Sequence, residues 1–153
     1  MNISTQKILG GIGAILQVVP LISIAGSVLL LVSFNQLSKT LNKPDMFKKY
    51  LTGFIIGFVG FIVLFVLIFI LNLFTLILAY ILFIIVAYYY KQAFDMLANA
   101  LNHKLFSTGA LLMFIGAITI ILFGLGGILL FVGWIILAVA FFTAPEEVEA
   151  NNS

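Results

Sequence analysis

The sequence has no cysteine and no arginine, and its single histidine is His103. Without cysteine the chain has no disulfide, no thiolate nucleophile and no cysteine-bound metal. One histidine alone cannot complete a zinc or haem site. Charged residues make up 8% of the chain and the net charge is +2, whereas soluble domains carry roughly a quarter charged residues. So little positive charge, spread over scattered lysines, excludes a nucleic-acid surface.

Apolar residues are what the chain has in abundance. They make up 64% of it, with a mean hydropathy of +1.32. A soluble fold of this length cannot cover that much apolar surface, so we expect the lipid bilayer of the cell membrane to be its solvent. The N-terminal segment resembles a signal peptide ending at Ala25, but the following residues are equally apolar. We therefore expect the segment to be retained as a membrane anchor.

The longest apolar run extends from Leu51 to Tyr90, and Asn72 lies near its middle. As one helix the run would be about 60 Å long, twice the roughly 30 Å thickness of the hydrocarbon layer. Asparagine suits a tight turn between two helices, although a polar group inside a membrane is often functional. We expect Asn72 to mark a turn, and we keep it as a candidate polar lining residue.

Two other apolar blocks contain possible breaks. The block from Phe106 to Thr143 contains the glycine-rich stretch 124–127, which predicts a helix stop and restart. The block from Thr5 to Leu41 contains Pro20, which either kinks one helix or separates a first arm of about 14 residues, short for a full span.

The positions of the charged residues favour a break at Pro20 over a kink in one helix. A break there brings Lys7 to the same side as every other charged residue, and the positive-inside rule makes that side cytoplasmic. We therefore favour six helices over five, arranged as three helical hairpins with a first helix that is short or re-entrant. Both long loops and the C-terminus are then cytoplasmic.

The chain also contains two similar short sequence segments. "LSKTLNK" begins at Leu37, and "LANALNH" begins at Leu97, sixty positions later. A short loop, a Thr-Gly pair and another apolar run follow each copy. This order predicts a parallel internal repeat.

Groups for catalysis are missing from the apolar runs. No Asp, Glu, Lys, Arg or His occurs within 8–38, 51–90 or 105–145, and catalysis needs a nucleophile, a base, a metal or a cofactor ligand. We predict no catalytic residue, no metal, no cofactor and no enzymatic activity. Gln17, together with Asn72, is a possible polar lining for the passage of a neutral solute.

Small residues form the best-defined face. Gly53, Gly57 and Gly60 give "GFIIGFVG", a spacing that lets membrane helices approach closely. The face serves either packing within the monomer or contact with a second copy or another membrane protein. If the face packs against another helix, we expect the backbones nearly to touch at Gly57, the centre of the face.

Three stretches resemble a known family. They are "KILGGIGAIL" at Lys7–Leu16, "LNHKLFSTGALLMFIGAI" at Leu101–Ile118 and "GWIILAVAFFTAP" at Gly133–Pro145. They look like the small, mainly archaeal membrane proteins of the domain of unknown function 996. The resemblance implies a multi-pass membrane protein and transfers no activity or catalytic residue.

These observations predict an all-α, polytopic transmembrane helix bundle of five to six helices. Residues 1–145 form one domain, and residues 146–153 form a short, acidic, disordered cytoplasmic tail. The first functional hypothesis is a non-enzymatic structural, accessory or partner-binding membrane component. The alternative is a channel or carrier for neutral or lipophilic small solutes.

Overall fold

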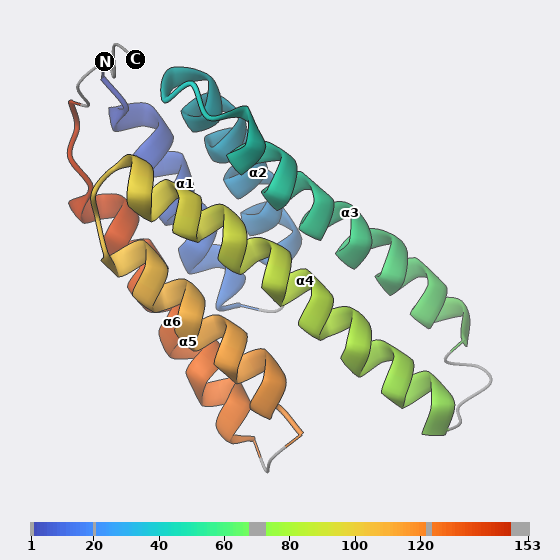
Figure 1. The fold of residues 1–153 in the computed structure, drawn as a ribbon. Helices are drawn as coiled ribbons and strands as arrows, with labels where there is room; N and C mark the ends of the chain where they lie inside the picture. Colours follow the sequence, from blue (N-terminus) through green and yellow to red (C-terminus); the bar gives the residue numbers. More distant parts are fainter. Residues whose placement is uncertain (1, 20, 68–72, 122–123, 148–153) are drawn as a thin grey trace.

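The computed structural model describes residues 2–19, 21–67, 73–121 and 124–147 (Figure 1). These residues form six helices and no extended strand. The helices are α1 Ser4–Gln17, α2 Ser23–Thr40, α3 Pro44–Leu67, α4 Leu73–Ala100, α5 Leu105–Thr119 and α6 Leu125–Thr143. The all-α class and the count of six helices are therefore confirmed.

The helices pair into three antiparallel hairpins, α1–α2, α3–α4 and α5–α6. Extensive contacts also join α2 to α3, α4 to α5 and α6 back to α1, which closes the bundle into a ring in chain order. The start of α1 and the end of α6 lie at the same end of the bundle as the α2–α3 and α4–α5 connections, opposite the α5–α6 turn (Figure 1). We call this end the charged end.

The predicted breaks agree with the helix ends. The chain leaves α1 at Gln17 and starts α2 at Ser23, so this block is a hairpin and not one kinked helix. It also leaves α3 at Leu67 and starts α4 at Leu73. Pro20 and Asn72, which were predicted to make these two turns, lie outside the described residues. At the third break Gly124 has φ 79° and precedes α6, a backbone conformation that glycine adopts without steric cost.

The two connections that were predicted as long loops are short, because α3 begins at Pro44 and α5 at Leu105. Both connections begin with the same backbone turn. Asn42 after α2 has φ 52°, and Asn102 after α4 has φ 49°. In each case the N–H of the following residue donates to a carbonyl in the last turn of the helix, Ser38 in one and Ala98 in the other, both at 2.9 Å. This is the capping pattern of a helix that ends in a left-handed residue. Asparagine tolerates that conformation, so the echoed "LN" pairs explain both helix ends.

Five aromatic side chains hold the charged end together. Phe34 of α2, Phe94 of α4 and Phe141 of α6 touch one another pairwise, with ring centroids 5.1, 6.2 and 6.4 Å apart. Tyr50 stacks on Phe34 at 4.4 Å, and Phe106 meets Phe141 edge-on at 4.8 Å. All five side chains are fully buried. Each hairpin thus contributes a phenylalanine from its second helix to a shared core.

Glycines allow the α5 and α6 backbones to approach closely. A Cβ added at Gly126 would lie 2.3 Å from the backbone nitrogen of Ile120 and 2.4 Å from the carbonyl oxygen of Gly116. A Cβ at the neighbouring Gly127 would meet nothing within 4 Å. Of these adjacent glycines at the start of α6, Gly126 therefore packs against α5, whereas Gly127 has open space beside it.

Three helices, α3, α4 and α6, are long and apolar enough to cross a membrane, and α5 is a shorter apolar helix. In the span windows of α3 and α4 only 17% and 11% of the residues are buried inside the protein. The exposed surface of these helices carries large apolar side chains, among them Phe61, Phe65 and Phe74. An apolar surface of this extent is incompatible with water as its solvent.

The adjacent glycines of α6 give a matched test of packing. Gly126→Ala should lower the free energy of unfolding by about 1–3 kcal/mol, because a methyl group would overlap backbone atoms that cannot rotate away. Gly127→Ala should change it by less than about 0.5 kcal/mol. Thermal unfolding in mild detergent measures both variants, and equal melting temperatures would contradict the close approach of α5 and α6.

Candidate functional site

The site begins with a cavity of about 350 Å³ beyond the end of the α1–α2 hairpin. This volume falls within the roughly 300–1,000 Å³ range of small-molecule pockets. The wall comes from the end of α1, one face of α4, the middle of α5 and the first half of α6. Its residues include Gln17, Val86, Ala87, Met113, Leu130 and Trp134.

The cavity results from unequal hairpin lengths. α1 and α2 have 14 and 18 residues, whereas α3 and α4 have 24 and 28. At 1.5 Å per residue, α1 is only about 21 Å long. Figure 1 shows that the α3–α4 and α5–α6 hairpins continue beyond the end of α1–α2. The ring of helices is therefore closed at the charged end and open beyond the first hairpin.

Gln17, predicted as a polar lining residue, lies in the cavity wall. Its Nε2 donates to the carbonyl oxygen of Ser23 at 3.2 Å and to the hydroxyl of Ser27 at 2.7 Å. Because a carbonyl can only accept, the first bond fixes which end of the amide is nitrogen. The amide therefore ties the end of α1 to the start of α2, and its oxygen accepts no hydrogen bond among the described residues.

The rest of the wall is almost wholly apolar. Its aromatic members include Trp134, the only tryptophan of the chain, and Tyr90. The wall contains no Asp, Glu, Lys, Arg or His. The described part of the chain has no group of three His, Cys, Asp or Glu side chains that could hold a metal ion. The cavity is thus suited to bind a neutral group, and the phenol of Tyr90 is the one ionisable side chain among the described residues of its wall.

A second space, an apolar groove of about 610 Å³, runs along α4 and the end of α5. Ile77, Ile120 and Ile121 line it, and Phe83 lines both the groove and the cavity. The Tyr80 hydroxyl donates to the carbonyl of Ile118 beside this groove. Phe83 is therefore a wall of both spaces.

The predicted small-residue face packs on α4 of the same chain. A Cβ at Gly53 would lie 2.9 Å from the ring of Tyr90, and one at Gly60 would lie 3.3 Å from Leu82. At Gly57 the nearest atom, on Val86, would be 3.5 Å away, which is ordinary van der Waals contact. No backbone atom of another helix lies within 4 Å of that Cβ position, so the expectation that the backbones nearly touch at Gly57 is wrong. The approach is tightest at Gly53, because the bulky Tyr90 packs directly over it.

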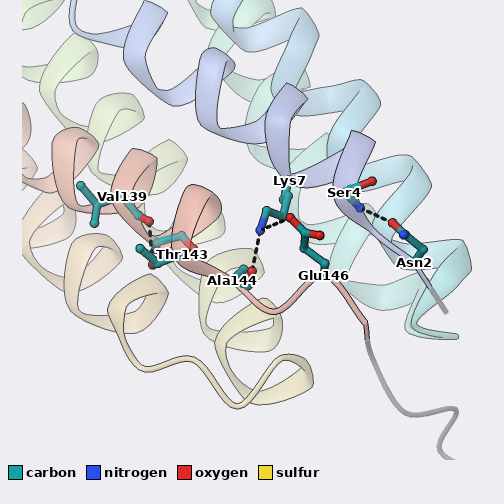
Figure 2. A network of polar contacts seen from close by, with 8 residues as sticks. Asn2, Ser4, Lys7, Val139, Thr143, Ala144 and Glu146 are labelled. Carbon is teal, nitrogen blue, oxygen red and sulfur yellow. Dashed lines mark hydrogen bonds and ion pairs between the residues drawn. The ribbon is translucent and has the colours of Figure 1, made fainter.

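A second polar site, missed by the sequence reading, joins the two ends of the chain (Figure 2). The Nζ of Lys7 donates to the carbonyl oxygen of Ala144 at 2.8 Å and lies 3.4 Å from Oε1 of Glu146. The N–H of Ile3 donates to the Glu146 carbonyl at 2.9 Å. Lys7 is only 8% exposed. We call this set of contacts the terminal clasp.

The clasp has a simple physical role. The last carbonyls of a helix have no partner within the helix, and a cation there also interacts favourably with the helix dipole. Lys7 supplies a hydrogen-bond donor and a positive charge at the end of α6, and so joins α1 to α6. The signal in the sequence was the placement of Lys7 on the same side as the acidic "PEEVE" stretch. Glu146 and Glu147, the first residues of the predicted tail, contact the N-terminal segment, and residues 148–153 lie outside the described part.

Two further polar contacts hold the charged end. The Asp95 carboxylate accepts from Lys91 and from the Ser107 hydroxyl, both at 2.5 Å, and so links α4 to α5. Nε2 of His103 lies 3.1 Å from Oγ1 of Thr143, which links the α4–α5 connection to α6. His103 is thus a structural contact in this fold.

The fold and the apolar surface define the class as a helical membrane protein. The chain belongs to the family described as "Protein of unknown function (DUF996)", whose model matches residues 22–76 and again residues 67–135. This confirms the resemblance found in the sequence.

One curated relative matches the chain over nearly the whole length of both proteins. The chain is 30% identical to "Uncharacterized protein MJ1644" of Methanocaldococcus jannaschii over 175 aligned positions, which cover 99% of this chain and 98% of that protein. No solved structure matches the chain.

The clasp predicts a specific loss of stability. Lys7→Met keeps the length and the apolar stem of the side chain but leaves the Ala144 carbonyl and Glu146 without their cation. The free energy of unfolding should fall by about 1–3 kcal/mol. The control is Lys48→Met, whose ion pair with Asp45 has side chains 72% and 69% exposed and should contribute at most about 1 kcal/mol. Thermal unfolding measures both variants, and a Lys7→Met protein as stable as Lys48→Met would contradict the role of the clasp.

Proposed function

We propose that the protein is a non-enzymatic, multi-pass membrane protein that binds a neutral, largely apolar molecule in the cavity beyond the α1–α2 hairpin. The observation that carries the proposal is the cavity itself, with an apolar wall, one amide and no ionisable acid or base other than the phenol of Tyr90. Ligand pockets are typically of this kind, mostly apolar with a few placed polar groups. This favours the hypothesis of neutral or lipophilic solutes over that of a purely structural component.

The orientation in the membrane follows from charge. In the proposal, the charged end, with the α2–α3 and α4–α5 connections and the chain ends, lies on the cytoplasmic side of the cell membrane. The α5–α6 turn lies on the external side. The proposal is supported by the position of all described lysines and acids at or near that one end and by their absence from the opposite turn.

The first hairpin is proposed to be re-entrant. At about 21 Å, α1 is shorter than the roughly 30 Å hydrocarbon layer. The segment after it is apolar and exposed, and Leu21 is 93% exposed. Non-helical backbone at membrane depth is tolerated only where protein surrounds it or where it lines a cavity. Gln17 donates to the Ser23 carbonyl in the first turn of α2 and lines the cavity beside this segment.

An internal duplication accounts for part of this architecture. The two matches to the family model and the equivalent turns at Asn42 and Asn102 support a parallel repeat. Repeats of this kind are common among membrane proteins whose sites lie between the repeated units. Here the cavity lies between the short hairpin and the two longer ones.

The small-residue faces do not support an oligomer. Gly53, Gly57 and Gly60 contact α4 of the same chain, and the glycines of α5 and α6 face each other. These faces are therefore occupied within the monomer. We do not extend the proposal to a homo-oligomer or to a partner protein.

Fluorescence of Trp134 tests the proposal, because the only tryptophan lies in the cavity wall. Purified protein in mild detergent, titrated with 1-bromododecane, should show saturable quenching by the bromine. Gly127→Phe should abolish the saturable component, since Gly127 lines the cavity and has free space beside it. Gly127→Ala is the matched control and should retain it. Quenching that rises linearly in the wild-type protein, or equally in all three proteins, would overturn the proposal.

A further inference from the structure

We infer that the ligand of this cavity is a long-chain alcohol, whose hydroxyl group donates a hydrogen bond to Oε1 of Gln17 while its chain follows the apolar wall. This inference rests on the proposed function and specifies its chemistry. It combines the Gln17 oxygen, which accepts no hydrogen bond among the described residues, the uncharged wall and the groove that shares Phe83 with the cavity.

The amide is held in one orientation. Its two N–H groups are directed to the Ser23 carbonyl and the Ser27 hydroxyl, at 3.2 and 2.7 Å. Rotating the amide would place its oxygen against the carbonyl oxygen of Ser23, which is repulsive. The oxygen of Gln17 is therefore fixed as an acceptor in the wall of an apolar cavity. Gln17 is half-buried, and its oxygen is accessible and not enclosed, so a ligand with a donor can reach it and gain a hydrogen bond in surroundings without water.

The composition of the wall selects the charge of the ligand. No lysine, arginine or histidine is present in it to neutralise a carboxylate or a phosphate, and no acid is present to pair with an amine. Transferring an unpaired charge into such surroundings is strongly unfavourable. Ethers and ketones are neutral but bring only acceptors, which would face the acceptor of Gln17. A neutral hydroxyl group satisfies both conditions.

The remaining space selects an elongated apolar body. The groove along α4 and the end of α5 adds about 610 Å³ beyond Phe83. Its walls are side chains such as Leu76, Ile77 and Ile121, which match a hydrocarbon chain. A chain that starts at Gln17 therefore continues past Phe83 along α4, towards the α5–α6 turn.

Two probes that differ only at the head group test the inference. Titrations of Trp134 fluorescence with 12-bromododecan-1-ol and with its methyl ether compare a donor with an acceptor of nearly equal size. Half-saturation should need about 5- to 10-fold less of the alcohol, the ratio that one hydrogen bond of about 1 kcal/mol produces. In Gln17→Met, which keeps the side-chain length without the amide, this ratio should fall to that of partitioning into detergent alone. Lys48→Met, a change at an exposed position of the charged end, should keep the preference.

The outcomes separate the inference from the proposed function. Saturable quenching with equal half-saturation for both probes in the wild-type protein would overturn hydroxyl recognition and leave apolar binding intact. Saturation by neither probe would overturn both. If Gln17→Met does not fold, the ratio measured in Gly127→Phe supplies the partitioning reference, and a wild-type ratio no larger than that reference overturns the inference.

Discussion

The hydrogen bonds of Gln17 to Ser23 and Ser27 are the interaction on which the functional account depends. A hairpin about 21 Å long ends inside the roughly 30 Å hydrocarbon layer in the proposed orientation. Its turn then exposes backbone groups where no water can pair with them, and each unpaired group costs several kcal/mol. The amide ties the end of α1 to the first turn of α2 and so holds the two helices of the short hairpin together. The short hairpin in turn leaves the cavity between α4, α5 and α6.

The two ends of the bundle differ because the first hairpin is shorter than the other two. At the charged end all three hairpins are present, and the rings of Phe34, Phe94 and Phe141 fill the centre. The clasp of Lys7 on Ala144 and Glu146 closes the ring of helices there. Beyond the first hairpin only two hairpins remain, and they enclose the cavity incompletely. Stability is thus concentrated at one end and space for a ligand at the other.

Much of the architecture was predictable because the thickness of a bilayer limits helix length. Runs of about twice that length had to be broken, and the described helices end or begin on either side of Pro20 and Asn72, at Gln17 and Ser23 and at Leu67 and Leu73. The third helix start follows Gly124, whereas the other two glycines of that stretch lie within α6. The echoed "LN" pairs marked two helix ends. The helix faces that pack together were less predictable, because a helix that is apolar on every side has no distinct apolar face to indicate which neighbour it contacts. For that reason the sequence did not show that Gly57 makes only ordinary contact with α4. Nor did it predict the contact between Phe34 and Phe141. The burial of Lys7 depended on the return of α6 to α1, which is a property of the whole fold.

The depth of the first turn tests the account most directly. A spin label on Leu21→Cys, in a chain without other cysteines, can be compared in bilayers with labels on Phe61→Cys of the apolar α3 surface and on Lys43→Cys of the α2–α3 connection. Collision rates with dissolved oxygen and with a water-soluble nickel chelate report lipid and water contact respectively. The account predicts that the label at position 21 behaves like the one at position 61, with strong oxygen and weak nickel collisions. Nickel collisions at position 21 as frequent as those at position 43 would contradict it, because the first hairpin would then reach water.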